Sequence, residues 1–239
     1  MKLQNMVKLV AVSNMKYEGG PEMKGNYEQM TQWVEELKNP ISNLMGRLEL
    51  YQEDMALDCY HHLWENCQDL DDNVNRLVRL IRMYEGDILP CWEFVLLTDR
   101  LEHALREKEE LGRRKGISFR SEYLKGDYKI WTDGKMLQDL VEQMLQHVIQ
   151  YAERGNTIRL GVQIHSEHLM LWVENEGQGF TFIPHLLYTA RNSRETGTGL
   201  GTRMELCRRL AFSLGGELSE EYAGRGGIRV GLRLPIVRA

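Results

Sequence analysis

The sequence has few cysteines, few prolines and no long hydrophobic run. Its 239 residues include only 4 cysteines and 5 prolines. The cysteines have neither the paired spacing of a metal site nor a disulfide framework, so we expect buried thiols in a reducing cytoplasm. The longest apolar stretches, such as 6–12 and 169–173, are far shorter than the roughly 20 residues of a spanning helix. The start lacks a signal-peptide pattern, so a cytoplasmic chain without a membrane segment is expected. The cysteines are Cys59, Cys67, Cys91 and Cys207.

The chain also lacks an excess of positive charge. It has 30 Lys and Arg against 35 Asp and Glu, which gives a net charge of -5, and the basic residues are scattered. Nucleic acid is therefore not an expected partner. With 42% hydrophobic and 27% charged residues, the chain can bury substantial cores, and its length fits two domains.

An apolar stripe predicts a long helix in the first half of the chain. Glu35 and Asn39 fall off this stripe, four residues apart, and therefore share an exposed side of the helix. Pro40 predicts a kink just beyond them, because proline forfeits a backbone hydrogen bond. The stripe repeats at spacings of three and four and consists of Met30, Val34, Leu37, Ile41, Leu44, Leu48 and Tyr51.

A second stripe follows the charged turn at 52–54 and predicts a second long helix. Two amphipathic helices make a poor core alone, so we expect the hairpin at 27–86 to pair with a second copy into a four-helix bundle, as a homodimer. The alternative is a hairpin that folds onto its own second domain. Residues 1–26 are expected to be an N-terminal segment or linker. The second stripe consists of Leu63, Cys67, Leu70, Val74, Leu77, Ile81 and Tyr84.

The pattern changes in residues 87–239 to that of an α+β domain. We expect a sandwich of one mixed sheet with helices on one face. Asp133 is the expected N-cap of a helix that ends at Tyr151. The other expected helices are 94–114 and 201–214, and the expected strands are 117–123, 129–132, 157–164, 168–174 and 228–234.

Two glycine clusters in this domain predict a nucleotide pocket. The segment 175–179 follows a strand, and the segment 197–201 precedes a helix. Glycines allow the backbone to approach a phosphate, and free amides at a helix start attract negative charge. About twenty polar residues between the clusters are typical of a lid. The alternative is a glycine-rich hinge.

Five motifs in this order resemble the cytoplasmic core of a sensor histidine kinase. They include the Trp-Val-x-x-x-Lys-x-Pro-Ile run at 33–41, the stretch 131–135, its continuation at 142–145, and both glycine clusters. The resemblance covers 27–235. It implies a dimerisation and phosphotransfer hairpin followed by a Bergerat-type (GHKL) HATPase domain. The first three motifs most resemble kinases that work beside ABC transporters in peptide-antibiotic responses.

The sequence departs from this family at three positions. Glu35 stands at the phospho-acceptor position, and a carboxylate lacks the imidazole nitrogen that forms a phosphoramidate. His147 stands where the family has the asparagine that holds magnesium, a hard ion that prefers oxygen ligands. Asn175 replaces the aspartate that accepts a hydrogen bond from the adenine amino group; an amide oxygen can still accept it, without charge assistance.

The rest of the pocket motif matches the family. Arg191 and Arg194 in the lid can meet phosphates. The resemblance therefore implies ATP binding that is weak or independent of magnesium, and makes magnesium a poor cofactor. The matching or enclosed positions are Tyr151, Gly177, Gly179, Gly197, Thr198, Gly199, Leu200 and Gly201.

These departures favour a pseudokinase that docks a response regulator or a partner histidine kinase. The alternative is an active enzyme. Glu36 and Asn39 keep the family's phosphatase pattern, an acidic residue followed three positions later by an amide, which can orient a water toward an aspartyl phosphate. A kinase with an atypical acceptor, at Glu35 itself or at His61 or His62, is the less favoured form of this alternative.

Overall fold

The computed structural model describes residues 41, 44–46, 48, 57–122, 128–176, 200–223 and 227–236. The chain divides into two compact units, with the division between Leu89 and Pro90. The predicted hairpin lies in the first unit, and the predicted α+β domain lies in the second. The two units are described separately.

The first unit contains the long helix α3, Leu57–Glu85. This helix confirms the one predicted from the second apolar stripe. Three stripe residues, Leu63, Leu70 and Tyr84, are 39%, 48% and 37% exposed. Their spacing of seven or fourteen residues places them on one side of the helix. Of the first predicted helix, Ile41, residues 44–46 and Leu48 are described, and they are helical; the predicted turn at 52–54 lies outside the described residues.

The second unit is built on a five-stranded mixed sheet. Alternating apolar residues along its strands point to one face, as the period of two requires. The strands β2 and β4 are parallel, and the other neighbouring pairs are antiparallel. Their order is β2 (Ser118–Glu122), β4 (Thr157–Ile164), β5 (His168–Glu176), β7 (Gly227–Pro235) and β6 (Glu217–Ala223).

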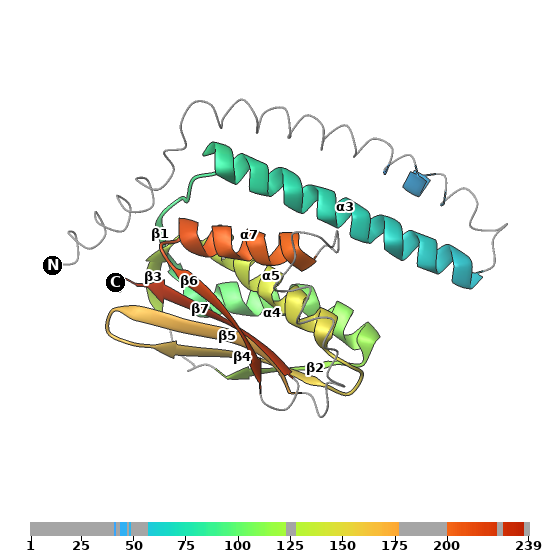
Figure 1. Cartoon of the computed structure of the whole chain (residues 1–239). Coiled ribbons are helices and arrows are strands. Elements are labelled where there is room, and N and C mark those ends of the chain that lie inside the picture. Colours follow the sequence, from blue (N-terminus) through green and yellow to red (C-terminus); the bar gives the residue numbers. More distant parts are fainter. Residues whose placement is uncertain are drawn as a thin grey trace. The chain divides into compact units, whose positions relative to one another are not determined.

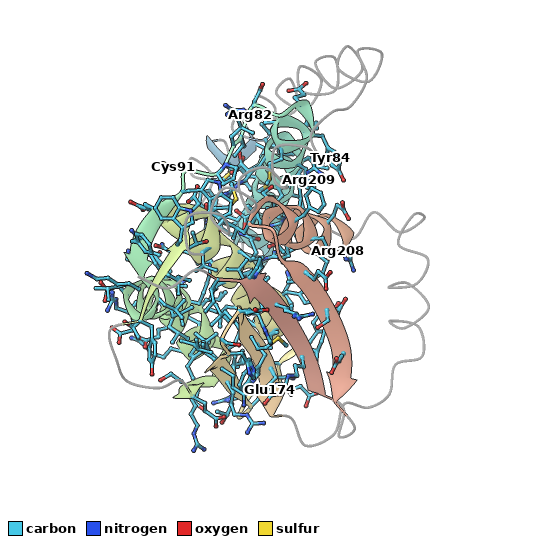
Figure 2. The ribbon with its side chains drawn as sticks, turned by 90° about the vertical axis from the view of Figure 1, so that its left-hand side faces the viewer. Arg82, Tyr84, Cys91, Glu174, Arg208 and Arg209 are labelled. Atoms are coloured by element: carbon cyan, nitrogen blue, oxygen red, sulfur yellow. The ribbon has the colours of Figure 1, made fainter. Side chains whose placement is uncertain are left out.

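Three helices cover one face of this sheet (Figure 1). They are α4 (Leu97–Lys115), α5 (Gly134–Tyr151) and α7 (Leu200–Ser213). Arg208 and Arg209 lie on α7 in the helical layer, whereas Glu174 lies on the sheet (Figure 2). Gly116 ends α4 with a φ of 69°, a left-handed conformation that favours glycine. The fully buried core between the layers includes Leu137, Leu140, Met144, Leu171, Val173, Val230 and Leu232. The expected α+β sandwich is confirmed.

Two further strands form a separate small sheet, which corrects two expectations. The strand β1 (Glu93–Leu96) pairs antiparallel with β3 (Lys129–Thr132), so the unit does not have one single sheet. The helix expected from residue 94 starts at Leu97 instead. Phe94 stands opposite Trp131, and their rings meet edge to face at 5.0 Å. This cross-strand pairing across 37 residues overrides the local helical pattern, because β propensity depends on the partner strand.

Other differences from the expected elements are smaller. The strand β5 ends at Glu176 and so includes Asn175, which was expected to follow the strand. The strand β6 was not expected, because its sequence is mostly polar.

The described cysteines differ in burial. Cys207 is buried, but Cys67 is only partly buried and Cys91 is exposed, so the expectation of buried thiols is wrong for Cys91. These three described cysteines are free thiols.

Candidate functional site

The helix α5, which carries His147 and Tyr151, is fixed at its start by Asp133. One carboxylate oxygen, Oδ1, accepts the N–H of Met136 at 2.8 Å, which is an N-cap interaction. The other oxygen, Oδ2, accepts the N–H of Cys91 at 2.7 Å. The predicted cap is confirmed. One side chain thus anchors α5 to the segment that leads into β1, which sets where the later residues of the helix lie.

His147 is buried and paired with a carboxylate from the sheet. It is 1% exposed, and its Nε2 lies 2.9 Å from Oε1 of Glu220 on β6. An ionised carboxylate only accepts hydrogen bonds, so Nε2 carries the hydrogen. The ring of Tyr151, one turn later, meets the His147 ring edge-on at 5.0 Å between centroids. The other ring nitrogen, Nδ1, is buried and has no hydrogen-bond partner among the described residues.

Asn175 is also buried, and its amide holds two strands together at the end of the sheet. It is 4% exposed, and its Oδ1 accepts the N–H of Ile228 on β7 at 2.6 Å. Its Nδ2 is buried and, within the described parts of the chain, has no hydrogen-bond partner. The amide therefore uses its acceptor for the fold and keeps its donor free.

The sheet register places Asn175 close to the His147 pair. Glu220 stands opposite Val230, and Val230 stands opposite Val173. Asn175 is two residues beyond Val173 and so lies on the same face, toward the helices. Two strand spacings and two residues separate Glu220 from Asn175, which corresponds to about 12 Å between their Cα atoms. Residues that are 28 positions apart in the sequence, His147 and Asn175, are thus brought to one part of the helix-covered face.

The helix α7 begins within the second glycine cluster, one residue earlier than expected. Leu200 and Gly201 form its first turn, and the helix packs against α5 and β6. The N–H groups of a first helical turn have no partner within the helix, so this turn is a favourable position for an anion. The remaining predicted site residues lie outside the described residues: Glu35, Glu36, Asn39, Gly177, Gly179, Arg191, Arg194, Gly197, Thr198 and Gly199.

Magnesium does not fit the environment of His147. The imidazole is a poor ligand for this hard ion, and its Nε2 is already committed to Glu220. In the described ranges, no group of three or more His, Cys, Asp and Glu side chains is arranged to hold a metal ion.

Glu220 was missed by sequence reasoning, because it lies on a polar strand that gave no strand signal. Only the sheet register identifies it.

The five-stranded mixed sheet and its three covering helices have the fold of the HATPase domain of sensor histidine kinases. Full-length ShkA in complex with AMPPNP matches with a TM-score of 0.67 and 17% identity, over 89% of this chain and 46% of that one. AdeS from Acinetobacter baumannii matches with a TM-score of 0.58 and 15% identity, over 84% of this chain and 97% of that one. ThkA in complex with the response regulator TrrA matches with a TM-score of 0.62 and 16% identity, over 88% of this chain and 61% of that one.

The sequence comparison leads to the same kind of protein. Sensor protein kinase GraS from Staphylococcus aureus (strain JH1) is 21% identical over 181 residues, 73% of this chain. The chain spans about half the length of such curated relatives, 51% for GraS. No family model matches the chain. The chain is therefore histidine-kinase-like in sequence and has the fold of the histidine-kinase cytoplasmic core with its HATPase domain. Among its described helices, none is long and apolar enough to cross a membrane.

Proposed function

We propose that this chain is a pseudokinase of two-component signal transduction. It docks a response regulator or a partner histidine kinase and does not phosphorylate itself on histidine. The similarity to GraS and the complex of ThkA with TrrA support a role in such a pathway. The sequence supports the loss of autophosphorylation, because the phospho-acceptor position is occupied by Glu35 and not by a histidine. We place the chain in the cytoplasm, where response regulators act.

The observation that carries this proposal is the buried pair of His147 and Glu220. It occupies the position at which the family resemblance places the magnesium ligand. If Nε2 bound any other partner, the buried imidazole of His147 and the half-buried carboxylate of Glu220 would lose their hydrogen bond. Leaving such groups unpaired is costly. The pair therefore disfavours a metal-dependent phosphoryl transfer at this site.

Nucleotide binding without magnesium is retained in this proposal. Asn175 has a buried amide donor that is unpaired within the described part of the chain and suits a base, and the first turn of α7 suits a phosphate. Arg191 and Arg194 add positive charge toward the phosphates. ShkA was solved with AMPPNP, a nucleotide analogue. A bound nucleotide would add contacts to the pocket and so stabilise the domain that a partner recognises.

The test is incubation of the full chain with radiolabelled ATP and magnesium. We expect no label on the wild type, because the acceptor imidazole and the metal ligand are both missing. The matched comparison is the triple variant Glu35→His, His147→Asn, Asn175→Asp, which restores all three family residues and should gain acid-labile label. Label on the wild type that persists at neutral pH and is lost in acid would overturn the pseudokinase proposal.

A phosphatase remains the second candidate, on the sequence observation that Glu36 is followed three residues later by Asn39. The amide would orient a water toward the aspartyl phosphate of a docked regulator, and the carboxylate would help to position it. A phosphorylated response regulator should then lose phosphate several-fold faster with wild type than with Asn39→Ala. Asn43→Ala, four residues further along the same predicted helix, is the control. Equal rates for wild type and Asn39→Ala would leave docking as the only role.

A further inference from the structure

The side-chain amide of Asn175 has a fixed orientation. Its Oδ1 faces the backbone N–H of Ile228 at 2.6 Å. A backbone N–H only donates, so the atom that faces it must be the oxygen and not the nitrogen. The free atom of the amide is therefore Nδ2, a donor, on the side away from the Ile228 N–H.

The surroundings prevent the amide from turning over. In the same row of the sheet, the neighbours of Asn175 are Ile158 on β4 and Ile228 on β7, and both side chains are buried. Both are aliphatic, so neither of these two described neighbours offers a polar side-chain atom to the amide. A flipped amide would place Nδ2 against the N–H of Ile228 and would leave two donors facing each other. Because Oδ1 is held against the N–H of Ile228, the site presents the Nδ2 donor on the side away from β7.

We infer that Asn175 selects a 6-oxopurine nucleotide, with guanine or hypoxanthine as the base, over an adenine nucleotide. The assignment rests on the proposed function, in which Asn175 faces the base of a bound nucleotide. A purine with a carbonyl at C6 offers an acceptor to Nδ2 and satisfies this buried donor. Adenine has an amino group at C6, so two donors would meet there.

An aspartate at this position would have the opposite preference. One carboxylate oxygen would still accept from the N–H of Ile228, and the second oxygen would accept from an adenine amino group. The change from aspartate to asparagine therefore reverses the hydrogen-bonding character of the free atom without disturbing the contact to β7. Adenine still has acceptors at its ring nitrogens, so we expect a preference of about tenfold rather than complete exclusion.

The test compares ITP with ATP, which share the ribose and the phosphates and differ in the base at C6 and N1. Binding to the full chain is measured by titration calorimetry without magnesium. Wild type should bind ITP about tenfold more tightly than ATP, a difference of about 1.4 kcal/mol. Asn175→Asp should reverse the order and bind ATP more tightly than ITP.

A matched control is Asn156→Asp, which adds the same charge at another asparagine. There Oδ1 accepts the N–H of Glu153 at 3.1 Å, so the aspartate keeps its contact, and the ratio of the two affinities should stay that of wild type. Equal affinities, or tighter ATP binding by wild type, would overturn the inference and leave nucleotide binding as proposed. Binding of neither nucleotide would overturn both the inference and the proposed pocket. A melting curve for each variant distinguishes lost selectivity from lost folding.

Discussion

His147 and Asn175 each use one polar atom to hold the fold and keep the other unpaired within the described part of the chain. Most buried polar groups in native proteins have a partner, so both unpaired nitrogens are candidates for contact with a ligand. Sequence reasoning identified both residues through the family resemblance. It did not identify their partners, Glu220 and Ile228, because a register between distant strands is not encoded in local periodicity.

The pair of His147 and Glu220 should contribute measurably to stability. His147→Leu or Glu220→Leu alone leaves the other group unpaired at a cost of about 1–3 kcal/mol, whereas the double variant removes both groups. The double variant should therefore lose less stability than the sum of the single variants, with a coupling of about 1–2 kcal/mol. Denaturant unfolding of the four proteins measures this coupling.

An exposed ion pair on α7 is the matched control for this cycle. Arg208 and Glu205 lie 3.9 Å apart with side chains 54% and 43% exposed. Their coupling should be close to zero, because solvent screens such pairs. A coupling near zero for the buried pair as well would show that the contact at 2.9 Å has no energetic role.

At the scale of elements, α5 is the part of the fold that the sequence predicts best. Its cap at Asp133 and its end at Tyr151 are confirmed, because both ends are determined by local chemistry and a strong apolar period. The strands β1 and β6 were missed for the opposite reason. The partner of β1, β3, is more than 30 residues away in sequence, and β6 is a mostly polar strand that pairs with the next strand, β7, so neither has a distinctive local pattern.

Asp133 should matter more than an ordinary acidic residue in a first helical turn. Asp133→Ala removes acceptors from the N–H groups of both Met136 and Cys91, so we expect a loss of about 2 kcal/mol. Asp99→Ala is the control. Asp99 is an exposed residue in the first turn of α4, a helix without a side-chain cap bond. The variant Asp99→Ala should therefore lose no more than about 0.5 kcal/mol of stability. Thermal unfolding compares the two variants, and similar losses would contradict a special role for Asp133.

At the scale of the whole molecule, the exposed side of α3 supports a dimer. Leu63 and Leu70, seven residues apart, are 39% and 48% exposed. Such a spacing of large apolar residues is typical of a helix seam that packs against another chain. The homodimer stays a prediction, and it is an arrangement that would bury both leucines.

The double variant Leu63→Glu, Leu70→Glu should weaken this dimer. Two carboxylates in an apolar seam are costly to desolvate, so dimerisation should become at least roughly 100-fold weaker, about 3 kcal/mol. Leu89→Glu is the control, because Leu89 is 57% exposed but lies beyond the end of α3. Sedimentation velocity over a range of concentrations measures the association. A monomeric wild type, or a variant that dimerises as well as wild type, would contradict the prediction.

The sequence by itself determined the α+β class, most helix and strand positions, and the resemblance to a histidine-kinase core. These follow from apolar periods, helix caps and glycine spacing, which act between neighbours along the chain. Only the tertiary structure decided that His147 is held by Glu220 and that the Asn175 amide donor has no partner among the described residues. Both depend on the pairing of β5, β6 and β7, which brings together groups 53 to 73 residues apart. Hydrogen bonds of this kind depend on distance in space, and the sequence contains no direct measure of it.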